Sequence, residues 1–255
     1  MDLLLGTIAL RPYVFVFLAI FLLAGACDLG GRRTLLFAGW VWPVAWLAEF
    51  ASTRTGIPFG LYHYTEDTRG RELFIANVPL MDSLSFTFLA YASFCLARFV
   101  WARRAPSSSA VALLSGVLMM LLDVVIDPLA VRGDRWFLGR IFYYPDGGPY
   151  FGVPLSNFLG WFIVGVAGVG GYLWLRATLI REPAAKSPEI VALTLVWPGI
   201  ALYYAVLGFN LAMTGWIREW SLLALGAGLH TVLALVLWAI YQRPSEGLTL
   251  EKQRA

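Results

Sequence analysis

Seven long apolar stretches, separated by shorter polar segments, dominate the pattern of hydrophobic positions along the chain. They lie at about residues 13–26, 35–50, 80–100, 110–131, 154–175, 190–210 and 221–241. A helix needs roughly 20 apolar residues to cross a bilayer, and most of these stretches approach that length. The pattern therefore predicts an all-α fold, a polytopic membrane helical bundle with about seven transmembrane helices, and residues 1–255 are expected to form a single domain.

The composition and the distribution of charge agree with a membrane protein. Hydrophobic residues make up 59% of the chain and charged residues only 14%, whereas soluble domains carry about 25% charged residues. Eleven of the 19 basic residues are expected on one side of the array: Arg32, Arg33, Arg98, Arg103, Arg104, Arg176, Arg181, Lys186, Arg243, Lys252 and Arg254. This bias favours a cytoplasmic C-terminus. The net charge of +3 is interpreted as topology and lipid contact, so no nucleic-acid partner is expected.

Six polar side chains lie within or at the edges of these stretches, all toward the same end of the predicted array. They are Glu49, Asp82, Asp123, Asp127, Asn157 and Asn210. Ionisable groups are costly in hydrocarbon, so several of them at one depth indicate a buried polar site. Asp123 and Asp127 are four residues apart, which puts both on one face of a helix, about 6 Å apart along its axis. Because burial disfavours the charged form of a carboxyl group, such a residue can stay protonated and act as an acid.

A short pattern occurs twice and suggests a duplicated helical hairpin. Residues 78–82 (Val-Pro-Leu-Met-Asp) open the third stretch, and residues 153–157 (Val-Pro-Leu-Ser-Asn) open the fifth. Each follows a loop rich in glycine and aromatic residues, and proline is well tolerated at the first helical position. In each unit an acid near the end of the preceding stretch, Glu49 or Asp127, is expected to face the polar residue that opens the next one.

Structural roles for the same residues remain open alternatives. Asp127, which precedes a proline, could end a helix, and Asn157 could bond to a neighbouring helix. Glu49 and Asp82 lie near the interface, where they could be hydrated or paired with a nearby arginine. Trp161 follows Asn157 by four residues, so its ring is expected on the polar face, where it could stabilise a cation. The glycines of the fifth stretch, at positions 165, 168, 170 and 171, are expected to pack against other helices.

The scarcity of some residue types narrows the chemistry. The two histidines, His63 and His230, cannot supply the histidine-rich cluster of a membrane di-iron oxygenase, and each is expected to have a satisfied hydrogen bond in a loop or helix. The two lysines, Lys186 and Lys252, lie outside the apolar stretches, which excludes a retinal Schiff base. Acid–base chemistry on a lipophilic substrate remains, and neither a metal nor a cofactor is expected.

Several segments resemble a known family of membrane enzymes. They are residues 56–64 (GIPFGLYHY), residues 77–80 (NVPL), the Asp123-x-x-x-Asp127-Pro128 pattern and residues 150–162 (YFGVPLSNFLGWF). Over about residues 40–165 the chain resembles the integral-membrane carotenoid hydratases of the gamma-carotene 1'-hydroxylase and bisanhydrobacterioruberin hydratase type. The resemblance implies an enzyme of a bacterial or archaeal cell membrane that needs no cofactor. Such an enzyme adds water to the terminal double bond of an acyclic (psi) carotenoid end and gives a tertiary alcohol.

This reaction fits the residues. Protonating such an alkene at its less substituted carbon creates a tertiary cation, which needs a neutral acid, an electron-rich surface and a positioned water. The candidate catalytic residues are Asp123 and Asp127, as the acid, with Glu49 and Asp82; the candidate substrate-binding residues are Asn157, Trp161, Tyr62, His63 and Asn210. The expected partners are a lipophilic carotenoid, water and membrane lipid, so the site is expected to open sideways to lipid. The oligomeric state and the particular carotenoid are left open.

Three alternatives remain open from the sequence. A membrane carotenoid cyclase would also begin with protonation but would add no water. A prenyltransferase would use Asp123 and Asp127 to hold Mg²⁺ and a diphosphate, although a matching second acidic motif is missing. A non-catalytic carotenoid- or lipid-binding membrane protein would tolerate loss of the carboxylates.

Overall fold

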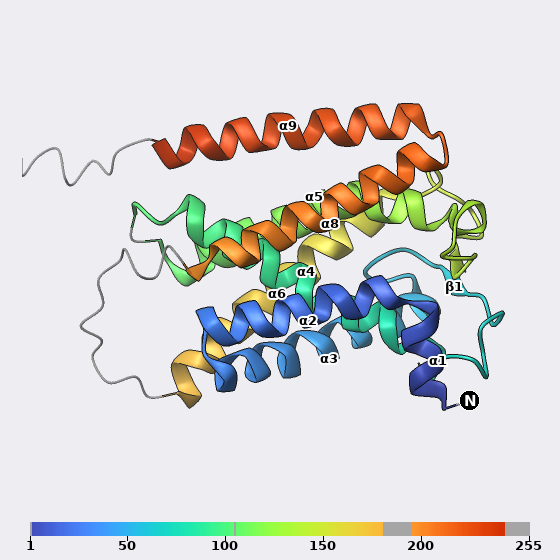
Figure 1. The fold of residues 1–255 in the computed structure, drawn as a ribbon, viewed down its shortest axis with the longest axis horizontal. Helices are drawn as coiled ribbons and strands as arrows, with labels where there is room; N and C mark the ends of the chain where they lie inside the picture. The colour runs from blue at the N-terminus through green and yellow to red at the C-terminus, as the bar shows by residue number, and fades with distance from the viewer. Residues whose placement is uncertain (1, 105, 181–194, 243–255) are drawn as a thin grey trace, which may run out of the picture.

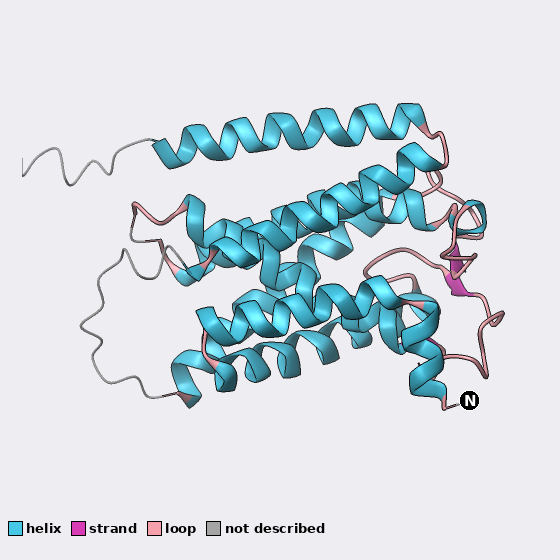
Figure 2. Cartoon of the chain, in the orientation of Figure 1, coloured by secondary structure: helices cyan, strands magenta, loops and turns pink. Residues whose placement is uncertain are grey.

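The computed structural model describes residues 2–104, 106–180 and 195–242, which form a bundle of long helices running roughly along one axis (Figure 1). The helices are α1 (Leu3–Leu10), α2 (Pro12–Asp28), α3 (Gly31–Thr55), α4 (Leu80–Val100), α5 (Ser108–Ala130), α6 (Leu155–Leu179), α8 (Trp197–Trp216) and α9 (Trp220–Gln242), with a 3₁₀ turn η1 (Gly133–Arg135). Figure 2 shows that most of the described chain is helical. Some predicted features lie outside the described residues, namely the start of the sixth stretch at residues 190–194 and Arg181, Lys186, Arg243, Lys252 and Arg254.

Five of the described helices are long and apolar enough to cross a membrane by length and composition: α3, α4, α5, α6 and α9. The pair α1 and α2 meets at a bend of 94° and gives a sixth span if it is counted as one. The predicted all-α polytopic helical bundle is therefore confirmed. The seven predicted stretches fall on these five helices and on α2 and α8. Taken alone, α2 and α8 are not among the helices long and apolar enough to cross a membrane. The sixth stretch ends later than predicted, because α8 extends to Trp216.

The bend between α1 and α2 occurs at Arg11 and Pro12, a feature that the apolar pattern did not predict. The Arg11 side chain is buried, pairs with Glu72 at 3.3 Å and donates a hydrogen bond to the Leu138 carbonyl. The backbone N–H of Leu73 donates to the Thr7 hydroxyl at 2.8 Å. These contacts attach the N-terminal helix to the two long loops at one end of the bundle.

Helix α4 forms the centre of the bundle, and most of its residues are buried. Helices α5 and α6 approach each other closely because of small residues. A Cβ atom added at Gly116 would lie 2.6 Å from Val166 Cγ2 and 2.8 Å from the Phe162 carbonyl oxygen, and one added at Gly165 would lie 2.9 Å from the Gly116 Cα. The predicted packing role of the glycine at position 165 is thus confirmed. Helix α9 lies at the edge of the bundle (Figure 1).

The two long loops, residues 56–79 and 131–154, lie at the same end of the bundle (Figure 1). A short antiparallel pair joins them, formed by β1 (His63–Tyr64) and β4 (Phe142–Tyr143), with Tyr64 opposite Phe142. A second pair, β2 (Phe74–Ile75) and β3 (Val78–Pro79), leads directly into α4. Because β1 and β4 come from loops that follow different helices, their pairing fixes one loop against the other above the ends of α3 and α5.

An arginine pair reinforces this end of the bundle. Arg132 donates hydrogen bonds to the carbonyls of Pro128 and Phe151, each at 2.7 Å. Glu219, in the turn between α8 and α9, lies 3.4 Å from Arg132 and also pairs with Arg135. The hydrogen bond from Arg135 holds the pKa of Glu219 below its usual range. This carboxylate therefore stays charged throughout the neutral range and connects α8 and α9 to the 131–154 loop.

Candidate active site

Five of the six predicted polar residues converge at the end of the bundle that carries the long loops. They are Glu49 on α3, Asp82 on α4, Asp123 and Asp127 on α5, and Asn157 on α6. Pro79 and Pro154 occupy the N-cap positions of α4 and α6, directly before the first helical residue. Asp82 and Asn157 each follow by three residues, so both lie in the first turn of their helices. The repeated five-residue pattern therefore places equivalent side chains at equivalent points of two helical hairpins.

Asp123 and Asp127 share one amide donor. Asn157 Nδ2 donates to Asp123 Oδ2 at 2.6 Å and to Asp127 Oδ2 at 2.8 Å, which uses both hydrogens of the amide. Tyr144, from the second loop, approaches the same Asp127 oxygen at 3.5 Å. Asp123 is fully buried and Asp127 is 8% exposed. The predicted i, i+4 pair is thus present, with Asp123 deeper and Asp127 nearer to open space.

Glu49 and Asp82 share one phenol. The Tyr64 hydroxyl lies 2.6 Å from Asp82 Oδ2 and 3.2 Å from Glu49 Oε1. The Tyr62 hydroxyl lies 3.4 Å from that of Tyr64. Burial raises the pKa of both tyrosines well above the usual range, and the neighbouring carboxyl groups act in the same direction. These hydroxyls therefore stay protonated and available as donors.

Ion pairs do not explain the cluster. Within the described part of the chain, none of Glu49, Asp82, Asp123 and Asp127 forms a salt bridge, and Arg11 is engaged with Glu72. Burying several carboxylates without cations is very costly, so such groups are neutral unless hydrogen bonds stabilise the charge. The cluster can therefore hold only a few ionised carboxylates at one time. Within the same described residues, no group of three or more His, Cys, Asp or Glu side chains is arranged to hold a metal.

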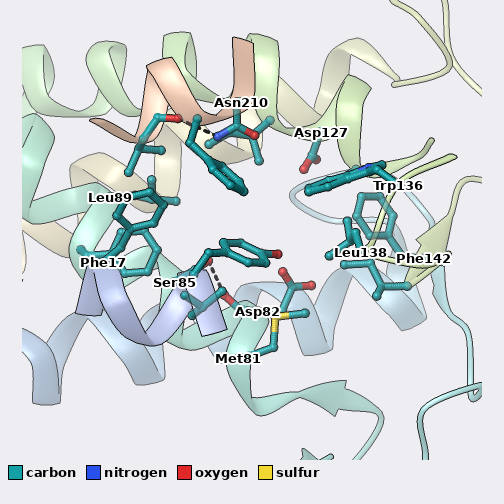
Figure 3. A pocket seen from close by; sticks show the side chains of 18 of the residues that line it. Phe17, Met81, Asp82, Ser85, Leu89, Asp127, Trp136, Leu138, Phe142 and Asn210 are labelled. Atoms are coloured by element: carbon teal, nitrogen blue, oxygen red, sulfur yellow. Dashed lines mark hydrogen bonds between the residues drawn. The ribbon is translucent and has the colours of Figure 1, made fainter. Parts of the chain in front are cut away.

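Two adjoining pockets meet at this cluster. The first, called here the polar pocket, has about 300 Å³ of empty volume, and its lining includes Glu49, Tyr62, Tyr64, Tyr144 and Asn157. The second, the apolar pocket, has about 670 Å³ of empty volume, and residues of α2, α4, α5 and α8 form most of its wall. Asp82, Asp127, Phe142 and Trp161 line both pockets. Figure 3 shows the carboxyl groups of Asp82 and Asp127 pointing into the same space from different helices.

An aromatic surface lies next to these two carboxyl groups. Trp161 stacks on Phe86 with ring centroids 4.2 Å apart and an interplanar angle of 16°. Phe59 packs 6.3 Å from Trp161, because the 56–62 segment folds over α6 at Gly160. A Cβ atom at Gly160 would lie 2.5 Å from the Phe59 ring, so only glycine permits this approach. The position predicted for Trp161, on the polar face of its helix, is confirmed.

The other predicted residues, Asn210 and His63, do not line the polar pocket. Asn210 lines only the apolar pocket, and its amide donates to the Val206 carbonyl of its own helix at 2.9 Å. His63 is exposed, packs against Tyr143 with ring centroids 5.9 Å apart, and lines neither of the two pockets. His230 has the expected hydrogen-bond partner, since its Nε2 lies 3.0 Å from the Leu121 carbonyl.

Sequence reasoning missed Tyr64 and Tyr144, which touch the carboxyl groups, and Tyr13, Trp136 and Phe209, which line the apolar pocket. For Tyr64 a signal existed. Side chains alternate between the two faces of a strand, so in the segment 62–64 the outer two tyrosines share a face that the central histidine does not. The apolar wall carries no such signal, because its aromatic residues come from segments far apart in sequence.

Comparisons with known proteins agree with this description. The family model described as carotenoid biosynthesis protein matches residues 2–237. A bisanhydrobacterioruberin hydratase from Haloarcula japonica is 28% identical over 231 residues, which cover 87% of this chain and 73% of the relative. No solved structure gives a significant match. The match across nearly the whole chain shows that this protein belongs to the carotenoid biosynthesis protein family.

Proposed function

We propose that this protein is a cofactor-independent hydratase that adds water to the terminal C1=C2 double bond of an acyclic (psi) carotenoid end group and forms a tertiary 1-hydroxy carotenoid. The observation that carries the proposal is the meeting of a polar and an apolar pocket at Asp82 and Asp127. Hydration of a polyene end needs this combination, because an apolar chain and a water molecule must reach the same carboxyl groups. The name of the hydratase relative supports the same reaction.

The apolar pocket would hold the end of the polyene. Phe17 on α2 and Phe209 on α8 are partly exposed and approach each other, with ring centroids 5.9 Å apart. Tyr13 stacks on Phe209 at 5.0 Å. We infer that the carotenoid enters from the membrane between α2 and α8, past these rings, while the rest of its chain stays in lipid. The sideways opening expected from the sequence would then lie between these two helices.

Asp127 would be the acid. Asp127 accepts from Asn157 and Tyr144 through Oδ2, and its carboxyl group also interacts with Asp123 and Trp161. We infer that this carboxyl group carries the proton that goes to the substrate. Transfer of that proton to C2 uses the π electrons of the double bond to form the new C–H bond and leaves a tertiary cation at C1. Trp161 offers an electron-rich ring beside that carbon. Asp123 would support Asp127 from behind, since both accept from the same amide.

A water molecule in the polar pocket would complete the reaction. Its oxygen lone pair forms the C1–O bond, and the proton that it loses passes to a carboxylate, for which Asp82 is best placed because it lines both pockets. Return of one proton to Asp127 restores the starting state. The net change is the addition of one water molecule, without an oxidant, a reductant or a metal in any step.

Isotope labelling in a lycopene-producing bacterium tests this proposal. Expression of the chain should yield pigments heavier by one or two water molecules, and growth in H₂¹⁸O should label the new hydroxyl oxygen. In D₂O the product should carry one non-exchangeable deuterium on the carbon next to the alcohol carbon. Label from ¹⁸O₂ would refute hydration, an isomer without added mass would indicate a cyclase, and unchanged pigment that co-purifies with the protein would indicate a binding protein.

A further inference from the structure

The Tyr64 hydroxyl is shared between two carboxyl groups but has a single hydrogen. It lies 2.6 Å from Asp82 Oδ2 and 3.2 Å from Glu49 Oε1. One O–H group can donate a strong hydrogen bond to only one of them, and the shorter distance assigns the hydrogen to Asp82. The contact with Glu49 is then favourable only if Glu49 itself supplies a hydrogen to the phenol oxygen.

The surroundings of Glu49 agree with a neutral carboxyl group. Glu49 is 3% exposed, and its second oxygen has no hydrogen-bond partner among the described residues. An ionised Glu49 would leave that oxygen as an unpartnered buried anion, which is more costly than a neutral group. The titratable side chains that line the polar pocket with Glu49 are acids and phenols: Tyr62, Tyr64, Asp82, Asp127 and Tyr144. A cation is not part of that lining.

The backbone holds Tyr64 in place independently of the carboxyl groups. Its strand pairs with β4, and its ring packs edge-on against Tyr62 at 5.3 Å and against Phe142 at 6.4 Å. The phenol can therefore change its donor direction only by rotating the O–H bond. A neutral Glu49 that donates to the phenol oxygen prevents this rotation and keeps the hydrogen directed at Asp82.

We propose that Tyr64 is a positioning residue that joins Glu49 and Asp82 into one hydrogen-bonded unit, in which Glu49 is protonated and Asp82 is the ionised member that faces the substrate. The inference rests on the proposed function for its consequence, because an ionised Asp82 is what the attacking water needs as a base. The protonation of Glu49 itself can be measured without any turnover.

Infrared spectroscopy of the purified protein in detergent gives the direct test. The difference spectrum between wild type and Glu49→Gln should show loss of a protonated-carboxyl C=O band that shifts in D₂O. In Tyr64→Phe this band should move to higher frequency, because Glu49 loses its acceptor. Loss of a carboxylate band in Glu49→Gln would show that Glu49 is ionised and would overturn the proposal, whether or not the protein makes a hydrated product.

Kinetics provide the second test, with Tyr143→Phe as the control because that exposed tyrosine lies on the same strand pair. Tyr64→Phe should lower kcat by roughly 10- to 100-fold, since a hydrogen bond to a charged group is lost, and should move the acid limb of the rate profile to higher pH. Glu49→Gln can still donate to Tyr64, so it should recover most of the activity that Glu49→Leu loses. Two results would refute the proposed hydrogen-bonded unit. One is an inactive Glu49→Gln variant together with an active Glu49→Leu variant, and the other is an unchanged pH profile in Tyr64→Phe.

If wild-type protein forms no hydrated carotenoid, the proposed function fails, and the infrared result still decides the protonation of Glu49. If hydration occurs and the carboxylate band is the one lost, the function stands and the further inference fails.

Discussion

Replacing Asp127 by asparagine should remove the acid and leave the architecture of the site in place. The substituted side chain keeps an oxygen that can accept from Asn157 Nδ2, now 2.8 Å from Asp127 Oδ2. Its amide nitrogen would replace Oδ1, and an amide cannot release a proton to an alkene. Side-chain volume is nearly unchanged, so helix packing and carotenoid binding should persist.

The expected cost follows from the role of the residue. Loss of a general acid typically lowers the rate by about 10²–10⁴, which corresponds to roughly 2.7–5.4 kcal/mol in the activation barrier. Asp123→Asn should cost less, because Asp123 is fully buried and lines neither of the two pockets. The asparagine still offers Asn157 an acceptor, but a neutral one, so the expected cost is that of weakening one supporting hydrogen bond, on the order of 1 kcal/mol or about fivefold in rate.

The assay measures the initial rate of hydrated-carotenoid formation in membranes that contain equal amounts of each variant. Asp146→Asn is the matched control, since this exposed aspartate lies in the second loop at the same end of the bundle. Near-normal turnover in Asp127→Asn would refute the assignment of the acid. A larger loss in Asp123→Asn than in Asp127→Asn would reverse the order of the pair.

Phe209→Ala should raise the apparent KM for the carotenoid about tenfold, equivalent to about 1.4 kcal/mol of lost aromatic contact, with kcat little changed; an unchanged KM would place the opening elsewhere. Gly116→Ala should lower the stability of the protein by about 1–3 kcal/mol in thermal unfolding, because α5 and α6 must separate, whereas Gly208→Ala, with no atom within 4 Å of its added Cβ, should be tolerated. If the two variants unfold alike, close packing of α5 on α6 is not required. Cysteines at Ile57 and Asp146, in a chain without native cysteines, should react with an impermeant maleimide from the same side of the membrane, and labelling from different sides would refute the convergence of the loops.

The parts of the site that were predictable are those set by helix periodicity and by the length of the spans. Asp123 and Asp127 lie on one helical face because they are four residues apart. Asn157 contacts both because α5 ends, and α6 begins, at the same end of the bundle. Glu49 and Asp82 converge on the same end for the same reason. A count of apolar stretches therefore placed five polar side chains correctly without any three-dimensional information.

The parts that were not predictable depend on loops and on contacts between distant segments. His63 was selected and Tyr64 was overlooked, because the pairing of β1 with β4, which decides which side chain faces the carboxyl groups, joins residues about 80 positions apart. Helix α1 was missed because its eight residues, Leu3–Leu10, lie before the first predicted stretch and are too few to cross a bilayer. The partner of Arg11, Glu72, lies in a distant loop. A buried ion pair between distant residues leaves no periodic signal in a sequence.

The two helical hairpins, α3 with α4 and α5 with α6, carry equivalent positions with different chemistry. Glu49 and Asp127 are the acids near the ends of the first helices, and the first turns of the second helices carry Asp82 in one case and Asn157 in the other. Asn157 can donate two hydrogens, so it bonds directly to the aspartates of its hairpin. In the proposed unit Asp82 is ionised and can only accept, so its hairpin requires a separate donor, which Tyr64 supplies from the adjoining loop. This single difference between an amide and a carboxylate would make one side of the site an acid and the other a base, as addition of water to a double bond requires.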